Sequence, residues 1–311
     1  MLHITNGDAA VPVIRSAGVT GEILPWRDVL HEGPVPAPAT LDSLRPLRAR
    51  FLAPEGGGSV VEVAREFEQR DRRLGAIASD QEVTLWFEHD LYDQLQLAQV
   101  LDWCATHRRT PPYDAPRLTL AQADDYLGLM KPEQARVLWE RRLDVTDAQL
   151  EAAQRSWGAF SSPDPRDIEQ VLDGVSALPF LRPALMRHLE EFPAAENGLS
   201  RTERQTLETL VVGSWPVQEL FHAAHHERED PIFLGDLFFV RLLKTLATGD
   251  EPLVRTDHEK AWLTDAGRET LAGTRDRVET LGIDRWLGGV HLKGRRVPFR
   301  WDREARRIVT S

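Results

Sequence analysis

The sequence predicts an α/β fold: an N-terminal parallel open sheet with flanking helices, then a helical connector and a winged-helix-like α+β domain. Three observations predict it. Short apolar strands alternate with amphipathic helices over residues 1–130, a rhythm typical of parallel strands joined by right-handed crossovers. Residues 131–197 carry helical patterns alone. In residues 198–311, helices alternate with short strands and turns, so we expect three parts with these bounds.

The first part is predicted to be a Rossmann-like domain. Its strands are short runs rich in apolar and β-branched residues, at 2–5, 21–24, 82–88 and 117–121. Helices are expected from Asp8 to near Gly18, over 41–52, from Ser59 to about Ile77, and directly after 82–88. Asp8 is placed to cap the first of these helices, and Ser59 with Glu62 forms a capping box. The helix after 82–88 is apolar over most of its surface, so we expect it to be buried.

The connector is predicted to be helical from Pro132 to Pro193. Pro132 suits a helix start, and Thr146 with Gln149 forms a second capping box. In the last part, Ser200 and Glu203 form a third capping box, and further helices are expected from Ser214 and over 235–247. Residues 252–273 then follow the strand, turn, strand and helix order of a wing, and the tail is expected to form short strands with a turn at 302–305.

The third helix of the winged-helix-like part argues against DNA reading. A helix that reads a DNA groove presents an exposed polar face to the bases. This helix instead carries a nearly continuous apolar run from Leu237 to Val240. The sequence therefore predicts that the helix is part of a core or of a protein interface, and a protein partner of the C-terminal domain is one expectation.

The charge distribution restricts the partners further. The chain carries a formal net charge of −11, which disfavours bulk binding of nucleic acid. Residues 285–311 are locally basic, with eight Lys and Arg residues against two acidic ones, so a weak nucleic-acid contact stays open there. The residues proposed for it are Arg295, Arg296, Arg300 and Arg303.

The remaining composition indicates the compartment. No apolar run approaches the roughly 20 residues that cross a bilayer, so we expect no membrane contact. No secretory signal precedes the first strand. Cys104 is the only cysteine, which suits a reducing compartment. The expected location is the cytoplasm.

Polar side chains gather where the predicted strands end. In an open α/β sheet, ligands bind beyond the carboxyl ends of the strands. Three strand ends deliver such residues here, so we expect them to converge on one small-molecule or nucleotide-type site. The residues proposed for catalysis are Asp8, His31, Glu88, His89 and Asp90. Those proposed for ligand binding are Asn6, Trp26, Arg27, Asp28, Glu32, Asp93 and Gln94.

These residue types suit a divalent metal that activates water or bridges a phosphate. Asp8, Glu88 and Asp90 would hold the metal or act as acid and base, the two histidines would transfer protons or ligate, and Arg27 would hold an anionic ligand. No standard metal motif such as HExxH or paired CxxC is present, so the cofactor itself stays unassigned.

Structural roles compete with the functional ones. Asp8 and Asp90 stand where helix caps belong, and Arg27 with Asp28 would suit a surface ion pair of little energetic weight. Trp26 suits a core position, His31 and Glu32 suit a solvated loop, and His89 suits a local hydrogen bond. Phosphate-binding glycine loops and a GxSxG elbow are absent from the sequence. Cys104 lies within the helix expected to be buried, a poor position for a nucleophile.

Three blocks carry a family resemblance. HITNGD at 3–8, GEILPWRDVLHEGPVP at 21–36 and LWFEHDLYDQLQLAQVL at 85–101 resemble a bacterial domain of unknown function, family 1835. Residues 178–193 and 197–210 are similar to the C-terminal part of longer members of that family. The resemblance implies that the strand-end blocks belong together, and it brings no activity or catalytic residues.

Two functional hypotheses follow. In the first, the N-terminal domain binds a small or nucleotide-type ligand at the carboxyl edge of its strands and carries out metal-assisted hydrolysis or group transfer. In the second, the protein is a non-enzymatic regulatory adaptor that binds a protein or nucleic acid through its winged-helix-like part. A pocket shared by the three strand ends would favour the first hypothesis. Side chains held as caps and ion pairs would favour the second.

Overall fold

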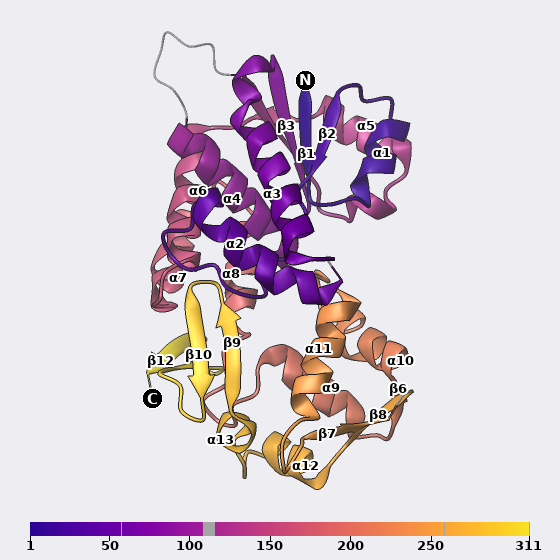
Figure 1. Cartoon of the computed structure of the whole chain (residues 1–311), viewed down its shortest axis with the longest axis vertical. Helices are drawn as coiled ribbons and strands as arrows, with labels where there is room; N and C mark the ends of the chain where they lie inside the picture. Colours follow the sequence, from indigo (N-terminus) through magenta and orange to yellow (C-terminus); the bar gives the residue numbers. More distant parts are fainter. Residues whose placement is uncertain (57, 108–115, 258, 311) are drawn as a thin grey trace.

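The computed structural model describes residues 1–56, 58–107, 116–257 and 259–310, and it has the α/β architecture that the sequence predicts. Five strands form the N-terminal sheet in the order β2-β1-β3-β4-β5. Figure 1 shows β1, β2 and β3 side by side. Their bounds are β1 Leu2–Thr5, β2 Glu22–Pro25, β3 Glu82–Phe87, β4 Arg117–Gln122 and β5 Leu143–Asp144. The first four run parallel, and β5 is an antiparallel edge strand.

Helices cover both faces of this sheet, so its central strands β1 and β3 are buried on both sides. Val83, Leu85 and Phe87 of β3 point into the main core, whereas Trp86 points into a second core on the other face. Helices α2, α3 and α4 lie on the first face and α1 on the second. Their bounds are α1 Ala10–Ser16, α2 Leu41–Leu52, α3 Val60–Gly75 and α4 Leu91–His107, with 3-10 turns at Ala53–Glu55, Ile77–Ser79 and Leu127–Leu129.

Two expectations about caps have opposite outcomes. The capping box at Ser59 and Glu62 is confirmed, because each backbone N–H donates to the side chain of the other residue. The prediction that Asp8 caps α1 is wrong. Ala9 occupies the N-cap position without a side-chain bond, and the Asp8 carboxylate pairs with Arg27 instead.

The connector is not wholly helical, contrary to the prediction, since β5 interrupts it and pairs with β4. Its capping box at Thr146 and Gln149 is confirmed. Helix α5 packs beside α1, and α6 packs along α4, so the layers of the N-terminal unit continue past residue 130. The bounds are α5 Pro132–Glu140, α6 Asp147–Phe160, α7 Arg166–Val171 and α8 Leu181–Leu189, with a 3-10 turn at Leu172–Gly174.

The last third contains small antiparallel sheets that fit a winged-helix-like part (Figure 1). The capping box at Ser200 and Glu203 is confirmed. The second helix is preceded by a two-residue strand, which pairs with the wing in the order β6-β8-β7. The bounds are α9 Arg201–Leu210, β6 Trp215–Pro216, α10 Val217–Phe221, a π-helical turn at His222–His226, α11 Asp236–Leu246, β7 Val254–Thr256, β8 Lys260–Leu263 and α12 Asp265–Leu271.

The apolar third helix, α11, faces the N-terminal unit of the same chain. Phe238 is buried and stacks on Phe51 of α2, with ring centroids 6.1 Å apart. Arg241 lies over the same ring and forms an ion pair with Glu55 at 2.9 Å. This confirms the prediction that α11 belongs to a core or interface, and the interface is within the chain.

The tail forms two hairpins, β9 with β10, which Figure 1 shows, and β11 with β12. The expected turn at 302–305 is confirmed, because the backbone N–H groups of Glu304 and Ala305 donate to Asp302 Oδ1. Among the described residues, no helix is both long and apolar enough to span a bilayer. The bounds are α13 Arg277–Leu281, β9 Ile283–Leu287, β10 Val290–Gly294, β11 Phe299–Asp302 and β12 Arg307–Thr310.

Candidate functional site

The order of the sheet determines where a ligand would bind. Strand β1 lies beside β3, and the chain continues from β1 to β2 on one side and from β3 to β4 on the other. Helix α1, which follows β1, and helix α4, which follows β3, cover opposite faces. The carboxyl ends of β1 and β3 are therefore the switch point at which doubly wound sheets bind their ligands. Asn6 follows β1 there, and Glu88 follows β3.

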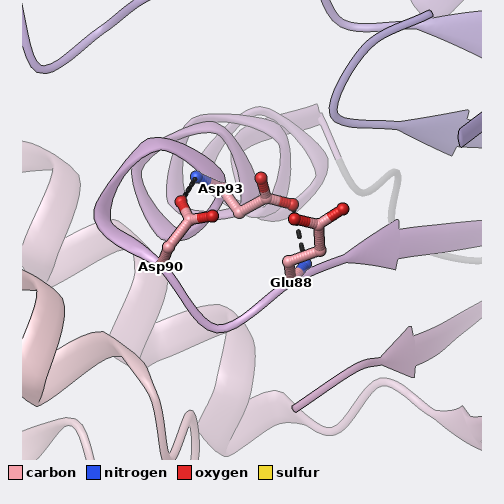
Figure 2. A group of neighbouring side chains, drawn as sticks. All are labelled: Glu88, Asp90 and Asp93. Carbon is pink, nitrogen blue, oxygen red and sulfur yellow. Dashed lines mark hydrogen bonds between the residues drawn. The ribbon is translucent and has the colours of Figure 1, made fainter. Parts of the chain in front are cut away.

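Three carboxylates meet at this switch point. Glu88, Asp90 and Asp93 each offer one oxygen atom, and these oxygens lie within 4.8 Å of one another. All three residues are buried, at 5%, 4% and 0% exposure. Figure 2 shows their side chains converging from the end of β3 and the first turn of α4. We call these three residues the carboxylate cluster.

Hydrogen bonds fix the geometry of the cluster. The Glu88 backbone N–H donates to Asp93 Oδ1 at 2.6 Å, and the Asp93 N–H donates to Asp90 Oδ1 at 3.0 Å (Figure 2). The second bond makes Asp90 the cap of α4, as expected from its position. Asn6 Nδ2 donates to Glu88 Oε1 and to Asp93 Oδ2, both at 2.9 Å. Residues predicted from two strand ends therefore do converge.

The cluster lacks a compensating positive charge. No Lys, Arg or His side chain in the described parts of the chain forms an ion pair with Glu88, Asp90 or Asp93. Burial, followed by the repulsion between these carboxylates, raises the pKa of Asp90 to about 7 and that of Asp93 well above its ordinary range. Burial also raises the pKa of Glu88. Unpaired buried charge is costly, so the cluster is stable only when it holds protons or a cation.

Sequence reasoning missed several residues that support the cluster. The backbone N–H of Leu127 donates to Glu88 Oε1 at 2.8 Å, and the Tyr92 hydroxyl donates to the Asn6 carbonyl at 3.0 Å. Tyr126 packs on His89, with ring centroids 5.4 Å apart, and burial raises the pKa of its hydroxyl to about 12. Leu127 and Tyr126 follow β4, the neighbour of β3, so the end of the fourth strand was the signal available in the sequence.

Gln94, one of the predicted ligand-binding residues, hydrogen-bonds to the backbone of the cluster residue Glu88. Its Nε2 donates to the Glu88 backbone carbonyl at 2.5 Å, which fixes the turn between β3 and α4. Its Oε1 accepts from Gln122 Nε2 at 3.4 Å. Both bonds are satisfied within the protein, so Gln94 positions Glu88 and does not face a ligand.

The residues predicted at the end of β2 have structural partners. Asp8 and Arg27 form a two-bond ion pair at 2.7 Å on the surface, where Arg27 keeps the pKa of Asp8 below its usual range. Trp26 is a core residue, and its Nε1 donates to Gln99. Asp28 is buried and accepts two bonds from Arg48, so the expectation of a surface pair between Arg27 and Asp28 is wrong.

His31 and Glu32 lie between the N-terminal unit and the last third. The His31 ring packs edge-on against Tyr92 and Phe233, and burial lowers its pKa to about 3. Glu32 forms an ion pair with Arg285 at 2.6 Å. Asp8 is thus paired at the surface and His31 is packed among aromatic rings, and neither hydrogen-bonds to Glu88 in the described chain.

A cleft of about 320 Å³ adjoins the cluster through His89, which stands between two cluster members in sequence. His89 packs on Tyr126 and Phe180, and its Nδ1 is buried with no hydrogen-bond partner in the described chain. The cleft is lined mainly by α8 and by residues 229–233. Its arginines are Arg182, Arg187, Arg201 and Arg306, and its acidic residues are Glu190, Glu229 and Asp230. Arginine side chains of this kind suit anionic ligand groups.

The larger cavity, about 990 Å³, lies at the opposite edge of the sheet, beside the start of β4. Cys104 lines it, and burial raises the pKa of this thiol to about 12, so the thiolate that a nucleophile requires is not formed near neutral pH. This cavity lies at the start of β4, away from the carboxyl ends of the strands where the carboxylate cluster lies.

The basic tail does not present one phosphate-binding surface. Arg300 is buried against Asp276 at 2.9 Å, which corrects the expectation that it contacts nucleic acid. Arg303 pairs with Glu196 at 2.6 Å, and Arg295 donates to the Glu279 carbonyl. Arg296 alone of the four is exposed without a hydrogen bond or ion pair to a described residue.

No protein-family model matches the chain, and no curated protein matches it. The chemistry of the residues must therefore carry the functional argument. Three carboxylates at one switch point can bind a hard divalent cation or share protons as acid and base. The arginines of the adjoining cleft can hold an anionic group.

Proposed function

We propose that the N-terminal unit binds a divalent cation at the carboxylate cluster and, through it, a small ligand at the carboxyl edge of the sheet. The observation that carries this proposal is the burial of three converging carboxylates without an ion-paired cation among the described residues. A bound cation would replace the missing charge. It would also remove the repulsion that raises the pKa of Asp90.

The spacing of the cluster suits such an ion. Oxygen ligands lie about 2.1 Å from Mg²⁺ and about 2.4 Å from Ca²⁺, so two ligands on opposite sides of the ion are about 4.2–4.8 Å apart. The three oxygens of the cluster lie within 4.8 Å of one another. An all-oxygen set favours Mg²⁺, Mn²⁺ or Ca²⁺ over Zn²⁺, which prefers nitrogen and sulfur ligands.

The surroundings indicate the class of chemistry. A divalent cation can bridge a phosphate or lower the pKa of a bound water. His89 lines the adjoining cleft and has one ring nitrogen without a partner, so it can accept or donate a proton there. We therefore propose hydrolysis or transfer of an anionic group, phosphoryl transfer above all. The resemblance to domain family 1835 would then group these strand-end residues as one site.

The second candidate is a non-enzymatic regulatory adaptor. Most of the predicted site residues outside the cluster are held in caps, ion pairs or the core, as Asp28 is by Arg48. Such fixed partners favour a structural role for them. In this alternative, protons shared among the three carboxylates would neutralise the cluster, and it would bind no cation.

A cation titration separates the two candidates. Isothermal calorimetry on the full-length protein, stripped with chelator, should detect Mn²⁺ or Mg²⁺ binding at one site. Glu88→Gln should abolish binding, because it removes a ligand charge and keeps the amide oxygen available to Asn6. Asp8→Asn, a matched change of an exposed carboxylate, should leave binding intact. If the stripped wild-type protein binds no divalent cation at millimolar concentration, the adaptor is the better account.

A further inference from the structure

A cavity of about 530 Å³ lies where the end of α8, the helix α9 and the β11–β12 turn meet. Glu190 is the only acidic residue among its described lining residues, although the whole chain has more acidic than basic residues. We call it the arginine cavity, after Arg201, Arg204, Arg228, Arg303 and Arg306. These arginines come from segments up to about 100 residues apart, so the fold, not a local charge run, assembles them.

The carboxylates around the arginine cavity do not satisfy all of its arginines. Glu208 is shared between two of them, and Glu229 is already bonded by Arg187. Arg306 forms no ion pair with a described residue. The pairs are Arg201 with Glu190 and Glu229, Arg303 with Glu196, and Arg204 and Arg228 with Glu208.

Repulsion within the cavity supports the same conclusion. The pKa of Arg204 is lowered, first by burial and then by the positive charges of Arg303 and Arg201. Arg306, whose backbone has a left-handed φ of 52°, lies in the turn that Asp302 stabilises. The turn therefore places Arg306 in the lining of the cavity together with the other four arginines.

We propose that the arginine cavity binds a small molecule through a diphosphate group. Guanidinium groups match phosphate oxygens with paired hydrogen bonds, which a lysine cannot provide. The volume of 530 Å³ is that of a small-molecule site. A nucleic acid would need an extended basic surface, and the net charge of −11 opposes it. The arginine cavity shares Glu190, Arg201 and Arg306 with the cleft beside His89, but binding there does not depend on a cation at the carboxylate cluster.

The test uses the full-length protein at low salt with EDTA present, so that cation binding at the carboxylate cluster plays no part. Inorganic pyrophosphate and adenosine diphosphate are titrated separately by calorimetry. Both should bind, since they share the diphosphate group. Equal affinities would mean that this group suffices, and tighter binding of the nucleotide would mean that its nucleoside is also recognised.

The variants assign the binding to the cavity. Arg306→Asn removes one guanidinium and suits the left-handed backbone, which Asn tolerates, and Arg204→Gln removes another. Each should weaken pyrophosphate binding about tenfold, the effect of losing a charge-assisted hydrogen bond. Arg296→Gln, on the exposed tail outside the cavity, is the matched control and should leave the affinity unchanged.

Three outcomes would overturn the proposal. The first is no binding of either probe at millimolar concentration by wild-type protein whose thermal unfolding is normal. The second is an equal loss of affinity in the Arg296→Gln control, which would assign the binding to general surface charge. The third is an RNA oligonucleotide that binds more tightly than both probes, which would make this surface a nucleic-acid site instead.

Discussion

Asp90→Asn should stabilise the cation-free protein at alkaline pH. In the folded protein Asp90 keeps its proton up to a pKa of about 7, whereas in the unfolded chain it loses the proton near its ordinary 3.8. The proton on Asp90 therefore contributes to the stability of the folded protein in acid. This contribution is lost as the pH rises from 3.8 to about 7. A shift of one pKa unit corresponds to about 1.4 kcal/mol, and the pKa of Asp90 rises from 3.8 to about 7. Ionised Asp90 therefore lowers the free energy of unfolding by at most about 4 kcal/mol.

The assay compares urea denaturation of wild type and Asp90→Asn in EDTA at pH 5, 6, 7 and 8. Asn retains the cap, because its Oδ1 can accept from the Asp93 N–H. The stability advantage of the variant should grow by about 1.4 kcal/mol per pH unit between pH 5 and 7 and then level off. Comparing the two proteins at each pH cancels the titration of groups that do not interact with Asp90.

Cation then reduces the stability difference between the wild type and the variant. At a concentration 100 times its dissociation constant, Mn²⁺ should stabilise the wild type by about 2.7 kcal/mol and leave Asp90→Asn nearly unchanged. The exposed Asp8→Asn variant should follow the wild type in both conditions. Parallel stability curves for wild type and Asp90→Asn from pH 5 to 8 would refute the reasoning, because they would mean that Asp90 ionises freely in the folded protein.

Three further predictions concern the framework around the site. Asp28→Ala should destabilise the protein by about 3–5 kcal/mol, since it leaves the buried Arg48 guanidinium unpaired; a loss under 1 kcal/mol in urea denaturation would contradict this. The pKa of His31 is lowered from 6.5 to about 3, so its contribution to stability is present above pH 6.5 and is lost as the pH falls. His31→Leu should therefore reduce the loss of stability between pH 7 and 5 by about 2 kcal/mol, and an unchanged loss would mean that the ring is hydrated. Phe238→Ala removes the stacking on Phe51 and should separate α11 from the N-terminal unit, with a cost of about 3–5 kcal/mol; limited proteolysis at an unchanged rate would argue against it.

Much of the fold follows from local sequence signals. The bounds of α2 match the prediction from the periodicity of residues 41–52, and the capping boxes at Ser59, Thr146 and Ser200 each begin a helix. Such signals act within one turn of a helix or one strand, so the chain displays them directly. The two-residue strand β5 escaped prediction because its pairing with β4 depends on a distant partner and not on its own residues.

The candidate site was predictable only where secondary structure alone places a residue. Glu88, Asp90 and Asp93 follow β3 within six residues, so a strand and the first turn of a helix bring them together. Asp28 and Glu32 looked equally suitable in sequence, but their partners Arg48 and Arg285 come from elements that only the tertiary structure brings near. Which polar residue meets a buried arginine cannot be read from spacing.

The contrast between those pairs and the cluster is the main physical argument for a ligand. The N-terminal unit neutralises Asp28 with Arg48 at 2.7 Å, so it can supply an arginine to a buried carboxylate. Four arginines line the cleft beside His89, yet none of them pairs with Glu88, Asp90 or Asp93 in the described chain. The missing charge at the cluster is therefore not explained by a shortage of basic side chains nearby. Three of these arginines, Arg182, Arg187 and Arg201, pair with other carboxylates. A fold that pairs those carboxylates and leaves the three of the cluster without an arginine favours a site whose positive charge comes from outside the chain.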